Sequence, residues 1–476
     1  MSDTLQLVWL RRDLRLYDHA ALHAALQGEG NIQPVFVFDT EVLTRFSNKD
    51  DRRLTFLATT LEGMHRSLKR YRSGIIVMHG KASELIPQAA DALGAARVMC
   101  EEDYEPGPRK RDEAVAKALE GQCEFKRVID HVIFPPEKIL KDDGGPYKVF
   151  TPYSKKWRQH IVKDTFAEKP VALNGRTASF DDCVNQLRGN GISVIDLDQG
   201  TDAALEKIGY KKADLGQWKT DQGRKRLSHF VEKYAQDYYK SRDYLADEEG
   251  TSRLSPYLRH GLVSIREAAR LVQERSGKGY DTWLNELIWR EFYQQIYYHF
   301  PEAETQEFNE KYRSLNWSQS EASITAFKEG KTGYPIVDAA MRQLLQEGWM
   351  HNRARMIVAS FATKDLHIDW RVGEEHFAQH LMDYEMASNN GGWQWAASTG
   401  TDAQPYFRIF NPTLQSEKYD KEGIYIKRFI PELKNVDQKY IHQPHASDKN
   451  VSLDYPKTIV DHKQEKEKAI AKFKAA

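Results

Sequence analysis

Residues 389 to 402, NNGGWQWAASTGTD, combine two adjacent asparagines, two adjacent glycines and two tryptophans within seven positions. A packed core does not need amides, and a surface loop does not need tryptophans. Adjacent glycines let a backbone approach a ligand closely. The stretch therefore predicts a site that holds a flat polar ligand against an aromatic wall.

A second group of chemical side chains lies in WLNELIWREFYQQIYYHFP, residues 283 to 301. At helical spacing Glu286, Trp289, Arg290 and Tyr293 share one face. An ordinary surface ion pair between Glu286 and Arg290, four residues apart, would explain the pattern without any function. Among tryptophans, however, a carboxyl group has a raised pKa and can donate a hydrogen bond to a ligand.

A third stretch, GWMHNRARMIVASF at 348 to 361, brings a polar, a cationic and a thioether side chain onto one helical face. These are Asn352, Arg355 and Met356. A buried Arg355 needs an acid, and the later DYE sequence offers Asp383 and Glu385. A purely structural ion pair between packed helices explains this pattern equally well.

Hydroxyl groups at Thr251, Ser252 and Ser255 precede an apolar turn in EGTSRLSPYLRHG, residues 249 to 261. Hydroxyls at a helix start can donate to a phosphate, and the helix dipole favours the anion. Most such stretches are only helix N-caps, so the motif is weak by itself.

The elements that position these groups are helical in the second half of the chain. GYPIVDAAMRQLLQEGW, 333 to 349, has Pro335 near a helix start and Gly348 as a stop. The final HKQEKEKAIAKFKAA is rich in lysine, which predicts a solvated terminal helix.

The first third of the chain alternates buried strands, LQLVWL, IQPVFVFD, GIIVMHG and ARVMCEE, with helices at 51–71 and 82–94. This alternation predicts a parallel sheet with helices on both faces. Without G-x-G-x-x-G after the first strand, a Rossmann-like scaffold that binds no nucleotide is favoured. We therefore expect an α/β domain at 1–134, a connector at 135–215 and an all-α domain at 216–476.

Bulk properties restrict the function classes. A length of 476 residues predicts two or more domains, and zero formal net charge argues against a uniformly basic nucleic-acid surface while leaving room for one basic groove. The three cysteines have neither metal-ligand spacing nor an even count. No apolar run is long enough for a membrane span, and the start matches neither a signal nor a transit peptide. We expect a cytoplasmic protein without membrane partners.

The motifs TSRLS, WLNELIWREFY, GKTGYPIVDAAMRQL, GWMHNRARM and NNGGWQWAASTGTD closely resemble the photolyase/cryptochrome family, as does LVWLRRDLRLYDHAAL near the start. The match is closest to bacterial class I cyclobutane pyrimidine dimer photolyases. The resemblance implies a helical domain that binds FAD and acts on UV-damaged DNA. It further implies that excited reduced flavin would send an electron to a flipped-out dimer, which would split and return the electron.

The resemblance also assigns roles to residues. For the catalytic roles, Glu286 would stabilise the dimer, Asn389 would face the flavin ring, and Trp393, Trp370 and Trp317 would carry electrons inward. The flavin site would comprise Tyr239, Thr251, Ser252, Arg253, Leu254, Ser255, Trp283, Glu286, Arg290, Asn352, Arg355, Asp383, Glu385 and Asn389. The DNA site would comprise Arg242, Glu286, Trp289, Arg290, Asn352, Arg353, Met356, Trp395 and Arg408. Because Trp317 has polar neighbours, we expect it at the surface, within reach of an external reductant.

Departures from the family pattern refine the expectation. Asn352 stands where photolyases for the (6-4) lesion have a second His, which favours the cyclobutane dimer. Glu385 stands where class I enzymes usually have Asp. Residues 104–115 lack the Asn-Glu pair of the folate-binding subgroup, so a deazaflavin, another flavin or no antenna is expected before folate.

Two alternatives stay open at this level. One is a cryptochrome-like blue-light receptor without repair activity, and the other is a flavin-free nucleic-acid-binding scaffold. For its quaternary state we expect a monomer.

Overall fold

The computed structural model describes residues 4–447 and 453–476. The chain forms two compact units, and each is built from separate segments. The first, the sheet unit, comprises Met1–Ile139, Lys156–Val231 and Arg253–Ser276; the second, the helical unit, comprises Leu140–Lys155, Glu232–Ser252 and Gly277–Ala476. The boundaries that the sequence predicts at 134 and 215 remain predictions.

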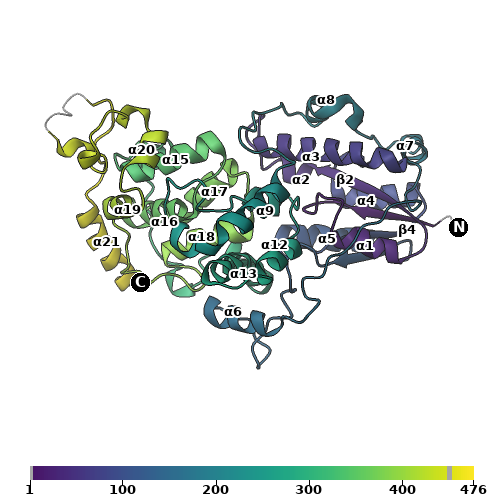
Figure 1. Ribbon diagram of the computed structural model, residues 1–476, viewed down its shortest axis with the longest axis horizontal. Helices are drawn as coiled ribbons and strands as arrows, with labels where there is room; N and C mark the ends of the chain where they lie inside the picture. The colour runs from purple at the N-terminus through teal and green to yellow at the C-terminus, as the bar shows by residue number, and fades with distance from the viewer. Residues whose placement is uncertain (1–3, 448–452) are drawn as a thin grey trace. The chain divides into compact units, whose positions relative to one another are not determined.

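The sheet unit contains a five-stranded parallel sheet in the order β3-β2-β1-β4-β5 (Figure 1). The strands are β1 Leu5–Trp9, β2 Asn31–Asp39, β3 Ile76–Gly80, β4 Ala95–Glu101 and β5 Glu124–Val128. The first four coincide with the predicted strands. Sequence reasoning missed β5, EFKRV, because its charged residues hide the apolar signal of an edge strand.

Side chains alternate between the two faces of this sheet. Leu7 and Trp9 enter a core with helices α4 (Ala82–Ala92), α5 (Pro106–Leu119) and α7 (Phe180–Gly189). Helix α1 (Ala20–Gln27) contacts β1, β2 and β4, and its buried residues lie outside that core, so it covers the opposite face. The predicted α/β sheet with helices on both faces is confirmed. The unit's other helices are α2 Thr40–Leu43, α3 Arg52–Leu68, α8 Gly200–Lys207, α9 Gly223–Lys233, α11 Ser255–Arg259 and α12 Ile265–Gln273.

The helical unit contains the site helices α13 Lys278–His299, α15 Pro335–Glu347, α16 Asn352–Ser360, α17 Trp370–His380 and α18 Met386–Ala397 (Figure 1). Helix α15 begins at Pro335, whose missing N–H needs no partner in the first turn, and ends before Gly348 at φ 64°. Both boundaries agree with the prediction. Its other helices are α10 Tyr238–Ser241, α14 Glu321–Lys328, α19 Pro412–Tyr419, α20 Ile424–Phe429 and α21 His462–Ala475. Helix α6, Phe150–Gln159, includes residues assigned to both units.

Helix α21 corrects one expectation. It is not a fully solvated terminal helix, because Ala469 and Phe473 are 0% and 1% exposed and Phe473 belongs to the helical core. These two residues are four apart and share a helical face, which the surrounding lysines obscure in the sequence. Within the described part of the chain, none of the helices combines the length and apolar character that a membrane span requires.

Candidate functional site

Helix α13 presents Glu286 and Arg290, and each forms an ion pair with another segment. Glu286 Oε1 accepts from Arg242 Nη1 at 2.5 Å, and Arg290 Nη2 donates to Glu385 Oε1 at 2.7 Å. The local pair between Glu286 and Arg290 is therefore not the arrangement formed. Burial raises the pKa of the Glu286 carboxyl, and although Arg242 opposes this, the pKa stays above its ordinary value.

The acid that the sequence pattern requires for Arg355 is Asp383. Arg355 Nη2 donates to Asp383 Oδ2 at 2.7 Å, joining α16 to the segment before α18. Asp383 Oδ1 is buried and has no hydrogen-bond partner among the described residues. The neighbouring Arg353 pairs instead with Asp243 at 2.8 Å. Exposed Asn352 donates its side-chain amide to Met356 Sδ at 3.8 Å.

Asn389 on α18 is oriented by a residue that sequence reasoning missed. Its Nδ2 donates to the backbone oxygen of Glu374 at 3.0 Å and to Glu374 Oε1 at 2.8 Å. Burial raises the pKa of Glu374 to about 7, despite the opposing hydrogen bond from Asn389. The only sequence signal was its place on α17, four residues after Trp370.

The tryptophans of the opening motif lie in different environments because α18 is helical. Trp393 is buried, with its indole Nε1 lacking a hydrogen-bond partner among the described residues, whereas Trp395 is half-buried at the edge of the core. A Cβ at Gly373 would lie 2.0 Å from the Trp393 ring, so the absent side chain lets α17 and α18 approach closely.

The glycines beside these tryptophans require a correction. A Cβ at Gly391 would lie 2.3 Å from the Tyr293 ring, so this glycine makes room for a side chain of α13 rather than for a flat ligand. Gly392 is exposed and has no atom within 4 Å of its Cβ position. The amides and tryptophans, not the glycines, remain the ligand candidates of this stretch.

Trp317 is not at the surface, contrary to the sequence expectation. It is 8% exposed and lies edge-on to Phe473, with their ring centroids 6.3 Å apart. Lys472 Nζ lies 4.7 Å from the Trp317 ring centroid. Helix α21 therefore covers this indole, which its polar neighbours in sequence did not reveal.

The hydroxyl motif is divided between the units. Thr251 and Ser252 belong to the helical unit, while Arg253, Leu254 and Ser255 belong to the sheet unit. Ser252 Oγ accepts from Trp283 Nε1 at 3.3 Å, and Thr251 Oγ1 is buried without a hydrogen-bond partner among the described residues. Arg253 has φ 48° and donates to Gln217 Oε1 at 3.0 Å.

Three further predicted residues lie near the surface of the helical unit. Arg408 and Tyr239 are exposed, and the ring of Tyr239 has the Lys278 ammonium 4.6 Å from its centroid. Half-buried Trp289 stacks on Phe150 at 3.7 Å with an interplanar angle of 6°. Phe150 comes from a Pro-, Gly- and Lys-rich segment that the sequence suggested was only a connection.

The helical unit thus contains buried polar atoms without a hydrogen-bond partner in the part of the chain that the structure describes: Thr251 Oγ1, Asp383 Oδ1 and Trp393 Nε1. Buried polar groups are normally hydrogen-bonded, so such atoms indicate a missing partner. Hydroxyl and carboxylate groups suit the phosphates and ring N–H groups of a dinucleotide. The residues present therefore fit a flavin nucleotide.

Comparison with known proteins assigns the family. A family model described as DNA photolyase matches residues 6–171, and one described as the FAD binding domain of DNA photolyase matches residues 283–475. The deoxyribodipyrimidine photo-lyase of Vibrio cholerae is 39% identical, covering 99% of this chain and 100% of the relative. The chain belongs to the DNA photolyase family. The predicted family and enzyme class, a photo-lyase, are confirmed, and the FAD-binding match supports the predicted cofactor.

Solved photolyase structures share this fold. A bacterial class III photolyase from Agrobacterium tumefaciens has a TM-score of 0.83 and 31% identity, covering 100% of this chain and 98% of that structure. An archaeal photolyase from Sulfolobus tokodaii, solved with two FAD molecules, has a TM-score of 0.83 and 29% identity, covering 99% and 100%. The predicted two-part photolyase fold is confirmed.

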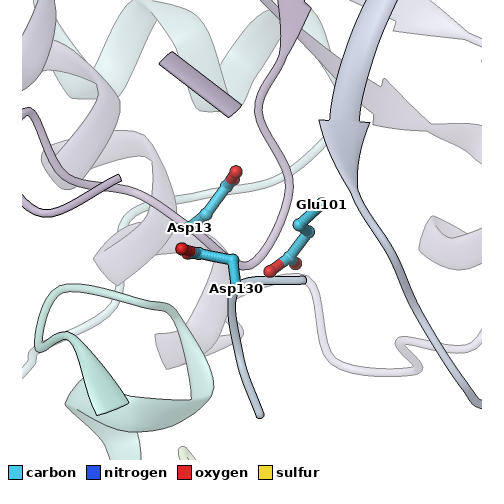
Figure 2. Close-up of side chains that lie close together, drawn as sticks. All are labelled: Asp13, Glu101 and Asp130. Atoms are coloured by element: carbon cyan, nitrogen blue, oxygen red, sulfur yellow. The ribbon is translucent and has the colours of Figure 1, made fainter. Parts of the chain in front are cut away.

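The sheet unit of this photolyase-family chain also gathers three buried acids that the sequence did not single out (Figure 2). Asp13, Glu101 and Asp130 lie at the carboxyl ends of β1, β4 and β5, with ligand atoms within 4.8 Å of one another. Asp130 accepts from Arg15 Nη2 at 2.6 Å, and Asp13 Oδ2 lies 3.1 Å from His19 Nε2. Arg15 balances Asp130, and the backbone N–H of Arg12 donates to Glu101 Oε1 at 3.0 Å, so these acids take part in contacts that hold the ends of the strands together.

Proposed function

We propose that this protein repairs cyclobutane pyrimidine dimers in DNA by a light-dependent reaction that uses FAD bound in the helical unit. The observation that carries the proposal is the Arg355–Asp383 pair, in which Arg355 holds Oδ2 while buried Oδ1 has no hydrogen-bond partner within residues 4–447 and 453–476. The names of the full-length relatives give the substrate class its support.

Bound FAD would supply the light absorption and the electron. In the protein, Arg355 donates to Asp383 Oδ2 and fixes the carboxyl group, so that Oδ1 would be available to accept a hydrogen bond from the flavin. Glu374 holds the amide nitrogen of Asn389 and leaves the amide oxygen as the group to meet the ring. The Thr251 hydroxyl is suited to donate to a phosphate oxygen.

The lesion would be recognised by Glu286 and the aromatic side chains near it. Arg242 holds Glu286 Oε1 and so fixes the carboxyl group that would hydrogen-bond the dimer. Trp289, with one face covered by Phe150, and half-buried Trp395 would pack against the pyrimidines.

DNA phosphates would be met by arginines rather than by a uniformly basic surface. Arg408 is exposed, and Arg353 is half-buried with its charge balanced by Asp243. Each phosphate contact releases counterions from DNA, so affinity should fall as the salt concentration rises. Because the net charge is zero, we expect this attraction to come from one local basic patch.

The electron supply would run through Trp317, Trp370 and Trp393, in that order inward. Each indole gives one electron to its inner neighbour and regains one from its outer neighbour, and an external thiol finally refills Trp317. An indole suits this task because its π-system gives up an electron more readily than an aliphatic side chain does.

Several finer points belong to this proposal. The class I assignment is a prediction, since a class III photolyase is among the similar structures. A second chromophore is proposed as a deazaflavin or another flavin, and the Sulfolobus tokodaii relative with two FAD molecules is consistent with the latter. A monomeric state and a cytoplasmic location also remain predictions.

The test is illumination of the purified, reduced protein with oligonucleotides that contain either a cyclobutane dimer or a (6-4) lesion. We expect FAD in the absorption spectrum and repair of the cyclobutane dimer alone. Asp383→Asn should lose FAD, whereas Glu375→Gln, on an exposed position of α17, should retain it. Bound flavin without any repair would favour a cryptochrome-like receptor, and absence of flavin would favour a binding scaffold.

A further inference from the structure

Glu307 lies between two of the proposed relay tryptophans. Its Oε1 accepts hydrogen bonds from Trp317 Nε1 at 3.4 Å and from Trp370 Nε1 at 3.3 Å. Glu307 and Trp370 are 4% and 1% exposed, so little water reaches the atoms that meet here. One carboxylate oxygen thus contacts both indole N–H groups.

Two cationic side chains, Arg371 and Lys472, lie beside Glu307 and the two indoles. Arg371 donates to Glu307 Oε1 at 3.0 Å and to Oε2 at 2.9 Å, and its guanidinium carbon lies 4.5 Å from the Trp370 ring centroid. Lys472 takes the corresponding place over Trp317. A cation over an indole face opposes removal of an electron from that ring. Asp369 Oδ1 also accepts from Arg371, at 3.1 Å, so two carboxylates offset the cation beside Trp370. Of these two, Glu307 is the one that accepts from both indole N–H groups.

Glu307 is charged at neutral pH. Burial raises the pKa of its carboxyl, but hydrogen bonds from Arg371 and Trp370 lower it more, so the pKa lies below its ordinary value. Arg371 engages both oxygens, which keeps the carboxylate a weak base.

The inner tryptophan has no such anion. The Trp393 Nε1 atom is buried without a hydrogen-bond partner among the described residues, and its ring packs against Gly373 and Phe377, the latter at 5.0 Å between centroids. A positive charge on Trp393 therefore lacks the stabilisation that Trp370 and Trp317 share.

We propose that Glu307 is a positioning residue of the electron relay, a shared anion that draws the positive charge from Trp393 outward to Trp370 and Trp317. This inference rests on the relay in the proposed function. One electron passes from Trp370 to oxidised Trp393, and one then passes from Trp317 to Trp370. Both indole protons stay on nitrogen, hydrogen-bonded to Oε1. A thiol outside the protein then reduces Trp317 and is itself oxidised. Because α21 covers Trp317, the carboxylate takes the stabilising role that water has at an exposed indole.

Glu307→Gln removes the charge and keeps an oxygen that can accept from an indole. Flash photolysis of the flavin-loaded enzyme would measure the yield of long-lived oxidised tryptophan. We expect a decrease of about tenfold in Glu307→Gln, as fits loss of one close charge in a partly buried site, and partial recovery in Glu307→Asp. Glu310→Gln removes a nearby exposed carboxylate and should match wild type.

A second readout does not depend on photochemistry. In protein with ¹⁵N-labelled tryptophan, the indole N–H resonances of Trp317 and Trp370 should shift in Glu307→Gln and stay in place in Glu310→Gln. Unshifted resonances, or an unchanged tryptophan yield in Glu307→Gln, would overturn the proposal. Equal losses in the Gln and Asp variants would do the same, because they would indicate a packing role.

The failure of this inference is distinguishable from failure of the relay itself. Trp393→Phe should abolish photoreduction of oxidised flavin. If it does and Glu307→Gln has no effect, only the role of Glu307 is wrong. If Trp393→Phe photoreduces normally, the relay is wrong and the role of Glu307 falls with it.

Discussion

At the scale of single residues, the surroundings of a side chain decide its chemistry. Three glutamates of the helical unit illustrate this. Burial raises the pKa of Glu286 despite its partner Arg242, and it raises that of Glu374 to about 7, whereas hydrogen bonds bring that of Glu307 below its ordinary value. One residue type thus has its pKa moved in opposite directions by burial and by hydrogen bonds within the same unit.

Glu286→Ala should lower repair while FAD stays bound. The variant removes the carboxyl group that would hydrogen-bond the dimer and stabilise its radical anion, and a hydrogen bond that involves a charged group is worth about 1.5–3 kcal/mol. Repair per absorbed photon should therefore fall about tenfold or more. The measurement is repair of a dimer-containing oligonucleotide at known photon dose, with bound FAD quantified by absorption.

The control for this variant is Asp281→Ala, which changes an exposed acid near the start of the same helix. It should repair at the wild-type level. Wild-type repair by Glu286→Ala would exclude the residue from the mechanism.

Glu374 should make stability depend on pH. Its pKa is raised from 4.5 to about 7 in the folded protein, so between these values the unfolded chain releases a proton that the folded protein retains. Stability should therefore fall as the pH rises from 4.5 to 7 and level off above. Glu374→Gln should flatten this part of the curve.

Urea unfolding of flavin-depleted protein at a series of pH values would measure this effect, with Glu321→Gln, at an exposed position of α14, as control. A slope in Glu374→Gln as steep as in wild type would contradict the assignment. The total change is on the order of 3 kcal/mol.

The sequence predicted the site residues that lie in motifs, but not those whose role depends on contacts between distant segments. Asn389 and Asp383 were identifiable from their motifs, and the sequence predicted that a buried Arg355 would pair with an acid. Glu374 and Glu307 carry no motif, and their importance arises only from packing against Asn389 and the tryptophans. The surface placement of Trp317 was wrong because its cover comes from a helix more than a hundred residues later.

At the scale of elements, the sequence predicted helices and strands well where proline, glycine or a continuous apolar run marked them. Pro335 and Gly348 bound α15 as expected, and four strands were evident from their apolar runs. Polar composition misled at β5 and α21, because an edge strand and a terminal helix need only a few buried side chains.

Gly348→Ala should destabilise the protein by about 1 kcal/mol, because its φ of 64° is costly for a residue with a Cβ. Gly63→Ala is the matched control. Gly63 lies inside α3 with open space at its Cβ position, so alanine there should stabilise by about 0.5–1 kcal/mol. Thermal unfolding of both variants gives the comparison, and effects of the same sign would refute the argument.

At the scale of the whole molecule, the two units are discontinuous in sequence. The TSRLS motif changes unit between Ser252 and Arg253. Sequence reasoning found the two fold classes because each has its own periodicity. It could not find the interleaving, since short exchanged segments such as 140–155 carry no periodic signal of the unit they join.

The antenna is a property at this scale, because a second chromophore adds to the whole protein's absorption. We expect no folate to copurify, since residues 104–115 lack the Asn-Glu pair of the folate-binding subgroup. Denaturation followed by mass spectrometry would identify the released chromophores. Stoichiometric methenyltetrahydrofolate would show this reading to be wrong, and an FAD-to-protein ratio near two would identify a second flavin.

The close packing of Gly373 against the Trp393 ring should determine which residues position 373 tolerates when cells must survive ultraviolet irradiation. Electron tunnelling slows exponentially with distance, and any side chain at position 373 would have to move the Trp393 indole or separate α17 from α18. A codon library at position 373, selected in cells that depend on this protein for recovery in light after ultraviolet exposure, should return glycine almost alone. The same library without ultraviolet selection should retain the smaller replacements that still fold.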